Sequence, residues 1–366
     1  MVFVQKFVPH YRLPFLEGVR EELARRGIEF VLVYGPPDPY EGSKVRTVSP
    51  DWGVAVDTRH LRVAGRWLYR QGAARHVRAG NLVVVEHAAK LLDNYGLWAR
   101  HLAGRIRMGY FGHGENFQTA HELGGSRFLK RAMLRVTRWF AYTEVSRRSL
   151  LSQGVADERI TVVDNTLAPP ELPSPMPERV PGRCLYIGGL YGDKRLEFLV
   201  EAAALAARAR PDFELHVVGA GPLEPLMREA AGHHPWLRFH GALYGADRAR
   251  LLASSQAILM PGLVGLVAID SFHFGAPLIT SHAGQHSPEV AYLEDGVNAL
   301  FDAADGTPAT YAALVERFLA DGALARRLRG ACATSAATYT IERMVARFCD
   351  GAERCFERPD ATAGRP

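Results

Sequence analysis

A glycine-rich turn that ends in two cations is the part of the sequence with the clearest chemical use. Gly188 and Gly189 follow an apolar run that predicts a strand at Cys184–Ile187, and Lys194 and Arg195 stand where the next helix is expected to begin. Glycines let backbone amides approach a phosphate, and the positive end of a helix attracts an anion. Cations at a helix start oppose the dipole preference for acidic residues, so a bound diphosphate would explain them. The alternative is a plain glycine turn with two solvated cations.

A second candidate is the loop and helix around Asp270. The loop Pro261–Gly265 leads into an apolar helical segment, in which Asp270 lies one to two turns from the start. A carboxylate on an otherwise apolar face needs a hydrogen-bond donor, and a ribose diol would provide two. The alternative is that Asp270 pairs with a nearby arginine or caps a local amide. Another glycine turn, Gly219–Pro222, follows a predicted strand between these two segments.

In the first half of the chain, polar side chains follow predicted strands. His113 comes directly after a strand, between two glycines, so its accessible imidazole suits binding or polarising a substrate hydroxyl. The alternative for a lone turn histidine is a merely polar role. Asn116 follows in the same turn, His10 and Arg12 follow the first strand, and Glu86 ends another. Open α/β sheets place their ligand contacts at the carboxyl ends of strands. Arg12 would contact a phosphate or an acceptor there, or only cap its helix.

Two series of alternating strands and helices, separated by a proline-rich break, organise the chain. The alternation predicts parallel sheets with crossover helices, hence an α/β fold of two doubly wound, Rossmann-like domains. The break at Ala168–Pro177 cannot form a regular hydrogen-bond ladder and is expected to be a linker. We expect domains at 1–170 and 178–338, and an amphipathic helix at about 340–356 that packs back on the first domain. The predicted strands are Val2–Val8, Ile28–Tyr34, Leu82–Glu86, Ile106–Phe111, Trp139–Thr143, Cys184–Ile187, Phe213–Val218, Leu237–His240, Ala257–Met260 and Pro277–Thr280, and the predicted helices include Leu13–Arg26, Ala89–Leu102, Ser126–Arg138 and Asp193–Arg208.

Composition excludes several classes of protein. A chain of 366 residues with 48% hydrophobic and 23% charged residues fits a globular two-domain enzyme, not a disordered or fibrous protein. The longest apolar runs have strand length, so we expect no transmembrane helix, and the first residues show no secretory leader. The cysteines have no metal-ligand spacing, so we expect no structural zinc and reduced thiols in a cytoplasmic protein. They are Cys184, Cys332, Cys349 and Cys355.

Positive charge is concentrated in the first half of the chain. Residues 1–175 carry 25 Lys and Arg against 17 Asp and Glu, whereas the remainder carries 19 against 22. A basic half would face anionic lipid, a phosphorylated acceptor or nucleic acid, or simply reflect an arginine-rich composition. The predicted helix at 126–138 could lie on an anionic membrane, although a crossover helix with solvated cations is the favoured interpretation. Its cations are Arg127, Lys130, Arg131, Arg135 and Arg138.

Taken in order along the chain, these segments resemble the retaining family-four glycosyltransferases, which have the GT-B fold. The most specific matches lie in the second half. Tyr186–Leu199 resembles the family's strand, phosphate loop and lysine, and Leu215–Leu223 its next strand and "GxGP" turn. Gly265–Ile279 is similar to the segment that holds the E-x7-E motif, and Ser287–Asn298 to the stretch that closes the same domain. In the first half, Ser146–Asn165 is similar to the segment before the linker.

The resemblance implies a donor site in the second half of the chain. In it, Lys194 binds the donor diphosphate, Asp270 holds the ribose hydroxyls, and amides around Gly265 and Leu266 meet phosphate or sugar. His113 would contact the donor sugar or the acceptor, so His113, Lys194 and Asp270 are the catalytic candidates. The remaining donor-side candidates are Gly188, Gly189, Arg195 and Gly219, and the acceptor-side candidates are His10, Arg12, Glu86 and Asn116.

Two positions depart from the family's pattern. Gly262 stands at the first acidic position of E-x7-E, so the usual contact with a sugar hydroxyl is missing. Gly189 stands where an arginine often precedes the phosphate-binding lysine, with Arg195 as its replacement in role. Both departures bear on which donor is used.

The implied function is a retaining hexosyltransferase that uses a nucleotide-diphosphate sugar, with UDP favoured over GDP. The acceptor would be a glycan, a lipid-linked intermediate or a small molecule, as in polysaccharide biosynthesis. We expect no cofactor or metal, because cations and amides neutralise the diphosphate, and no nucleic-acid partner. The two domains are expected to face a cleft that closes about the linker. Peripheral contact with the inner face of an anionic membrane is an open alternative to a purely cytoplasmic protein. Two alternatives stay open: a non-catalytic GT-B subunit that binds a glycan or a partner, and a nucleotide-sugar epimerase.

Overall fold

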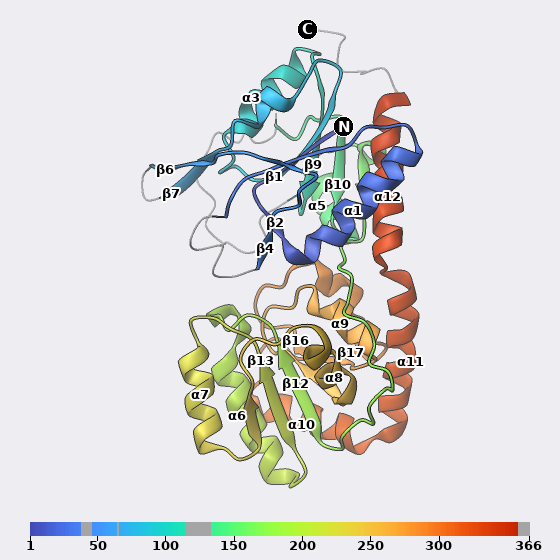
Figure 1. Ribbon diagram of the computed structural model, residues 1–366. Helices are drawn as coiled ribbons and strands as arrows, with labels where there is room; N and C mark the ends of the chain where they lie inside the picture. Colours follow the sequence, from blue (N-terminus) through green and yellow to red (C-terminus); the bar gives the residue numbers. More distant parts are fainter. Residues whose placement is uncertain (38–45, 64–65, 115–132, 358–366) are drawn as a thin grey trace. The chain divides into compact units, whose positions relative to one another are not determined.

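The computed structural model describes residues 1–37, 46–63, 66–114 and 133–357 (Figure 1). The chain divides into two compact units, one formed by Met1–Ala168 with Ile341–Pro366 and the other by Pro169–Thr340. The proline-rich segment begins at this division, and its residues 169–177 form neither helix nor strand. Each unit holds a parallel sheet with helices, which confirms the predicted α/β class.

Unit 1 is built on a parallel sheet of seven strands among the described residues. The strand order is β11-β10-β9-β8-β1-β3-β5, so the chain order reverses between β1 and β8. The strands are β1 Val2–Gln5, β3 Val31–Tyr34, β5 Val54–Ala55, β8 Leu82–Glu86, β9 Arg107–Gly112, β10 Arg138–Ala141 and β11 Ile160–Val162. Two short antiparallel pairs stand beside this sheet: β2 Val8–Pro9 with β4 Thr47–Val48, and β6 Arg59–Val63 with β7 Arg66–Arg70.

Alternating apolar residues of the strands give the unit 1 sheet two buried faces. One face packs against α1 (Leu13–Arg25) and α12 (Ile341–Glu357), where Phe348 lies edge-on to Phe3 and Phe15 with ring centroids 5.6 and 5.4 Å apart. The other face packs against α3 (Asp93–Leu102) and α5 (Glu144–Ser152). Figure 1 shows α12 at the red end of the chain running beside the blue α1. The short helical turns of this unit are η1 His10–Arg12, η2 Ala73–His76 and η3 Asp157–Arg159.

Unit 2 carries a six-stranded parallel sheet with the order β14-β13-β12-β15-β16-β17 within the described residues. Its strands are β12 Arg183–Ile187, β13 Glu214–Val218, β14 Leu237–Phe239, β15 Ala257–Leu259, β16 Leu278–Ser281 and β17 Ala299–Asp302. Its helices are α6 Leu196–Ala209, α7 Glu224–His233, α8 Gly245–Ser254, α9 Val267–Phe274, α10 Pro308–Ala320 and α11 Gly322–Thr338, with the turns η4 Gly192–Lys194 and η5 Pro288–Tyr292. This strand order is that of a dinucleotide-binding Rossmann fold.

The helix predicted at Ser126–Arg138 is wrong over its second half. The part before residue 133 lies outside the described residues, and the chain has left any helix by Leu134. Arg138 belongs to β10, is buried, and donates to the Thr161 hydroxyl at 3.0 Å. Val136 and Trp139 are fully buried against the sheet, which explains why a strand wins over the helical pattern. Arg138 therefore cannot serve a membrane-facing helix.

Other differences are local. The predicted helix from Asp193 begins only at Leu196, because Arg195 has a left-handed backbone with φ of 55°. The strand predicted at Val2–Val8 ends at Gln5, and β4–β7, β11 and β17 were not predicted. None of the helices that the structure describes is long and apolar enough to cross a bilayer. The four cysteines are all buried and form no disulfide.

Candidate functional site

The carboxyl ends of β12 and β15 form the switch point of the unit 2 sheet. β12 is the first strand of the unit, and its neighbours β13 and β15 lie on opposite sides of it. Open α/β sheets bind ligands in the crevice outside the carboxyl ends of the strands at such a point. The glycine turn with Lys194 follows β12, and the Gly262–Leu266 loop follows β15. The structure therefore brings together the two segments that the sequence singled out.

The turn after β12 packs tightly on the turn after β13. The Leu190 N–H donates to the Ala220 carbonyl at 3.0 Å. The hydroxyl of Tyr186 in β12 donates to the Gly189 carbonyl at 2.7 Å. A Cβ at Gly219 would lie 1.9 Å from the Gly188 carbonyl oxygen, so only glycine allows the two turns to meet. These glycines fix the shape of the loop that presents Lys194.

Lys194 is a half-buried ammonium held by the neighbouring loop. Its Nζ donates to the main-chain carbonyl of Leu263. Burial lowers the pKa of Lys194 to about 8, and the nearby Asp193 carboxylate opposes this effect. Five of the 44 Lys and Arg residues are lysines, and Lys194 alone lies after residue 130. A partly desolvated cation gains most when an anion approaches it, so Lys194 is suited to hold a phosphate.

Arg195 has partners within the protein, although the sequence suggested that it would be available to a ligand. Its guanidinium carbon lies 4.0 Å from the ring centre of Phe198, and one of its nitrogens donates to the Ser281 hydroxyl at 3.2 Å. Ser281 in turn donates to the Pro261 carbonyl at 2.7 Å. Arg195 therefore ties the start of α6 to the ends of β15 and β16.

Gly262 is fixed by the close approach of two main-chain segments. A Cβ at this position would lie 2.4 Å from the Asp193 carbonyl oxygen and 2.5 Å from the carbonyl carbon of Lys194. The next residue, Leu263, donates its N–H to the same Asp193 carbonyl at 2.9 Å. No side chain of any kind fits here, so the missing carboxylate of the E-x7-E pattern follows from how the two loops pack.

The N-terminus of α9 points its amides at the same end of the sheet. No side chain caps this helix, and no described residue accepts a hydrogen bond from the N–H groups of Gly265, Leu266 or Val267. A Cβ on Gly265 would meet nothing closer than Ser287 Oγ at 3.7 Å. Unsatisfied amides at a helix start favour an anion. Their contact with a ligand stays a prediction.

Asp270 pairs with an arginine, which was the alternative interpretation of its position in the sequence. It lies in α9, is 3% exposed, and forms an ion pair with Arg248 of α8. Burial raises the pKa of Asp270 to about 6, while Arg248 works in the opposite direction. The pair links two helices through a buried charge. A ribose contact of Asp270 remains a prediction, and it would have to compete with this pairing.

His286 is a residue of the site that sequence reasoning missed. Its Nδ1 accepts the Val264 N–H at 3.1 Å, and its Nε2 lies 2.9 Å from the Ser281 carbonyl. Because Nδ1 accepts and Nε2 must donate, the ring is a neutral imidazole. Burial is the main cause that lowers its pKa, and the Lys194 charge adds to it. His286 links the end of β16 to the Gly262–Leu266 loop through these two hydrogen bonds. A lone histidine in a turn gives no sequence signal for that role.

In unit 1 the structure brings Arg12 and His113 together at the carboxyl end of the sheet. Arg12 is buried and donates to the Asn165 side-chain oxygen at 2.8 Å. Its guanidinium lies 5.7 Å from the ring centre of Tyr142, and the His113 ring lies 4.4 Å from the same ring. Burial lowers the pKa of His113 to about 4, with added repulsion from the Arg12 and His87 charges. His113 is therefore neutral at physiological pH.

The other acceptor-side candidates differ in what they do. Glu86 accepts the Lys6 N–H at 3.3 Å, so it lies at the switch point between β8 and β1. His10 Nδ1 lies 3.1 Å from the Arg46 carbonyl oxygen, and this hydrogen bond links η1 to the segment that carries β4. Asn116 lies outside the described residues. No group of metal-ligating side chains that could hold an ion occurs in the described part of the chain.

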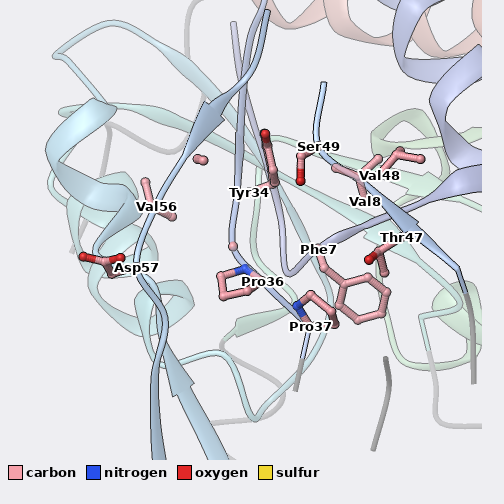
Figure 2. Close-up of a pocket in the computed structure, with 12 residues that line it drawn as sticks. Phe7, Val8, Tyr34, Pro36, Pro37, Thr47, Val48, Ser49, Val56 and Asp57 are labelled. Carbon is pink, nitrogen blue, oxygen red and sulfur yellow. The ribbon is translucent and has the colours of Figure 1, made fainter. Parts of the chain in front are cut away.

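A pocket of about 290 Å³ opens at the carboxyl ends of β1 and β3, and none of these candidates lines it (Figure 2). Its wall is mostly apolar and aromatic, and Asp57 is the charged group among the described lining residues. The lining consists of Phe7, Val8, Tyr34, Gly35, Pro36, Pro37, Thr47, Val48, Ser49, Ala55, Val56 and Asp57. This pocket was not predicted from the sequence, because strands β4 and β5, which complete its wall, have only two residues each.

Comparison with known proteins agrees with this geometry. Residues 181–321 match the family described as glycosyl transferases group 1. The glycogen synthases of two Mycobacterium tuberculosis strains, CDC 1551 and H37Rv, are 30% identical over 186 residues, which cover 49% of this chain and 44% of each relative. The chain thus spans less than half the length of these relatives.

Two solved structures illustrate the similarity of fold. The pneumococcal O-GlcNAc transferase GtfA in complex with UDP and GlcNAc has a TM-score of 0.68 and 10% identity, with 98% of this chain and 99% of that chain covered. Anabaena Alr3699/HepE in complex with UDP and glucose has a TM-score of 0.66 and 14% identity, with 96% and 99% covered. These likenesses confirm the predicted GT-B fold. The match of residues 181–321 and the identity to the glycogen synthases confirm the predicted resemblance to glycosyltransferases.

Proposed function

We propose that the protein is a retaining nucleotide-sugar glycosyltransferase, because residues 181–321 match the family of glycosyl transferases group 1 and the chain has the GT-B fold. The observation that carries the proposal is Lys194, a half-buried cation with a lowered pKa at the switch point of the unit 2 sheet. Its position beside the α9 amides suits a diphosphate. Unit 2 would hold the donor, and Arg12, Glu86 and His113 of unit 1 would serve the acceptor side.

In the proposed reaction the bond between the sugar C1 and the diphosphate oxygen breaks, and the acceptor oxygen bonds to C1 on the same face. The acceptor proton passes to the departing diphosphate. No protein nucleophile is required. Lys194 and the α9 amides would stabilise the charge that grows on the leaving diphosphate, an effect worth several kcal/mol in a site that excludes water. His113, neutral because of its low pKa, would bind or orient a hydroxyl.

UDP is the favoured donor nucleotide. Two structural neighbours of the same fold were solved with UDP, one with GlcNAc and the other with glucose. Their low identity makes this a choice of first ligand to test. GDP-sugars are the second donor class in our proposal, and a glycan, lipid-linked or small-molecule hydroxyl is the acceptor class.

A ligand panel tests the donor site directly. UDP, GDP and their hexose conjugates are titrated by calorimetry, with melting temperature as a second readout, because a bound ligand stabilises by mass action. Lys194→Ala should weaken nucleotide binding about ten- to hundred-fold, the value of a hydrogen bond to a charged group. Arg208→Ala, an exposed cation of the adjacent α6, is the matched control and should bind like wild type. The proposal fails if no nucleotide binds, or if Lys194→Ala and Arg208→Ala bind equally well.

A second candidate function follows from Gly262. With no carboxylate at this position and Asp270 paired to Arg248, a non-catalytic GT-B subunit that binds a glycan or a partner is the alternative. Incubation with UDP-hexoses and mass spectrometry of the products separates the two. Released UDP, free sugar or a glycosylated acceptor supports the enzyme, whereas nucleotide binding without turnover supports the subunit.

A further inference from the structure

The β6–β7 hairpin of unit 1 is a strongly basic segment that the proposed reaction does not use. Residues 58–85 contain six arginines and neither Asp nor Glu. This stretch accounts for most of the excess positive charge of the first half. In the hairpin, Arg59 pairs with Arg70 and Arg62 with Trp67 across the two strands, and all three arginines are exposed. Like charges directly opposite one another destabilise a sheet, so an anionic partner would relieve this arrangement.

Two large apolar side chains are exposed in the hairpin, one on each of its faces: the register puts Leu61 on the face of Arg59 and Arg70, and Trp67 on the face of Arg62. Leu61 is 44% exposed and Trp67 is 49% exposed. The chain has five tryptophans, all among the described residues, and Trp67 is the most exposed of them. The guanidinium of Arg62 lies 5.8 Å from the Trp67 ring centre, so a cation and an indole lie side by side. An anionic bilayer surface attracts such a segment in two ways: the apolar side chains leave water for the interface, and the arginines are attracted to the lipid phosphates.

The end of the hairpin nearest the unit 1 sheet is anchored through Tyr69, which is bonded to neighbouring segments of unit 1. Tyr69 is 3% exposed, accepts the Leu92 N–H, and donates its own N–H to the Lys90 carbonyl, both at 2.9 Å. The ammonium of Lys6 lies 3.7 Å from the centre of the Tyr69 ring. Figure 1 shows β6 and β7 extending from the unit 1 sheet as a separate arm.

We propose that the β6–β7 hairpin docks the protein on an anionic phospholipid bilayer. Because Trp67 and Leu61 lie on opposite faces of the hairpin, both enter the interface when the hairpin inserts with its strands along the membrane normal. Arg59, Arg62 and Arg70 then meet lipid phosphates. A soluble polyanion such as nucleic acid would use the arginines but has no need of an exposed leucine. The inference rests on the hairpin alone and is independent of the donor site.

Vesicle binding tests the proposal with the full-length protein. Sedimentation is measured with vesicles of phosphatidylcholine alone and with vesicles that also contain 30% phosphatidylglycerol, which supplies the anionic headgroup. We expect binding to the anionic vesicles only, and weaker binding as salt rises, because salt screens charges over about 8 Å. Insertion of Trp67 should shift its fluorescence to the blue, and brominated acyl chains should quench it. Trp67→Phe should bind but lose the shift.

Matched variants separate the hairpin from overall charge. R59Q/R62Q/R70Q should weaken binding on the order of a hundred-fold, at about five-fold for each arginine near the surface. R208Q/R317Q/R327Q removes three exposed charges from unit 2 helices and should bind like wild type. L61S/W67A should lose about ten-fold or more.

Several outcomes would overturn the inference: equal binding to neutral and anionic vesicles, equal loss in both triple variants, or a blue shift that persists in Trp67→Phe. Binding of heparin or duplex DNA to the hairpin without binding of vesicles would assign it to a soluble polyanion instead. Melting temperature serves as the folding control for the hairpin variants, and UDP titration reports separately on the donor site. Intact UDP binding with absent vesicle binding sinks the hairpin proposal and leaves the donor site untouched.

Discussion

Replacing Gly262 by alanine tests the contact between the two loops of the proposed donor site. A Cβ here would lie 2.4 Å from the Asp193 carbonyl oxygen and 2.5 and 2.6 Å from the carbonyl carbon and Cα of Lys194. All three are main-chain atoms, so no side chain can rotate away. The turn that carries Lys194 would have to retreat by about 1 Å to restore ordinary contact.

The expected loss of stability has two parts. Forcing an extra carbon into a packed contact costs about 1–3 kcal/mol. The same displacement breaks the 2.9 Å hydrogen bond from Leu263 to Asp193, which contributes about 1 kcal/mol. A total of about 2–4 kcal/mol lowers the melting temperature of a unit of this size by roughly 5–15 °C. Because Lys194 moves with the turn, UDP affinity should fall as well.

Scanning calorimetry and UDP titration measure both effects. Gly265→Ala is the matched control for stability, because its Cβ would lie 3.7 Å from Ser287 Oγ in the same loop. Neither glycine has a left-handed backbone, so the comparison isolates the steric effect. If Gly262→Ala melts like Gly265→Ala and binds UDP like wild type, the packing argument is refuted. Gly262→Glu, which restores the family's carboxylate, should be less stable still and should gain no activity.

Three further predictions concern charge. Arg248→Met leaves the Asp270 carboxylate buried without its cation and should cost about 3–5 kcal/mol of unfolding free energy in urea, most of it recovered in Arg248→Met/Asp270→Leu; equal losses in both variants would contradict this. UDP affinity should fall as pH rises through about 8, where Lys194 loses its proton, and a Lys194→Ala profile should be flat over that range. His216 is buried with a pKa lowered to about 4, so the unfolded chain binds its proton first, and stability should fall as pH drops from 6.5 to 4. Urea titrations should show a weaker fall in His216→Gln.

The parts of the site that the sequence predicts are those set by local order along the chain. Glycines after predicted strands, followed by a cation or a carboxylate, placed Lys194 and Gly265 at the carboxyl ends of β12 and β15. Parallel strands put all such ends at one edge of a sheet. Arg12 and His113 were predicted at one edge for the same reason, and they meet around Tyr142. Order and spacing were enough for these placements.

The sequence could not predict which partner each group finds. Asp270 pairs with Arg248, which is 22 residues away on another helix, and no spacing rule selects that arginine among many. Arg138 fits a helical pattern with its neighbours, yet burial of Trp139 in the sheet makes it part of a strand. His286 acts through two main-chain groups, so its residue type alone reveals nothing. Tertiary packing decided each of these cases.

The departures from the family's pattern become consistent when the charges of unit 2 are considered together. A carboxylate at position 262 would sit on the Lys194 main chain, where it would compete with a phosphate for the ammonium. In the structure a neutral main-chain carbonyl accepts from that ammonium, and among the described residues the adjacent Asp193 is the carboxylate that raises its pKa. The second acidic position keeps its carboxylate but neutralises it with Arg248. Both arrangements leave the Lys194 charge for an external anion, which is what stabilising a diphosphate leaving group requires.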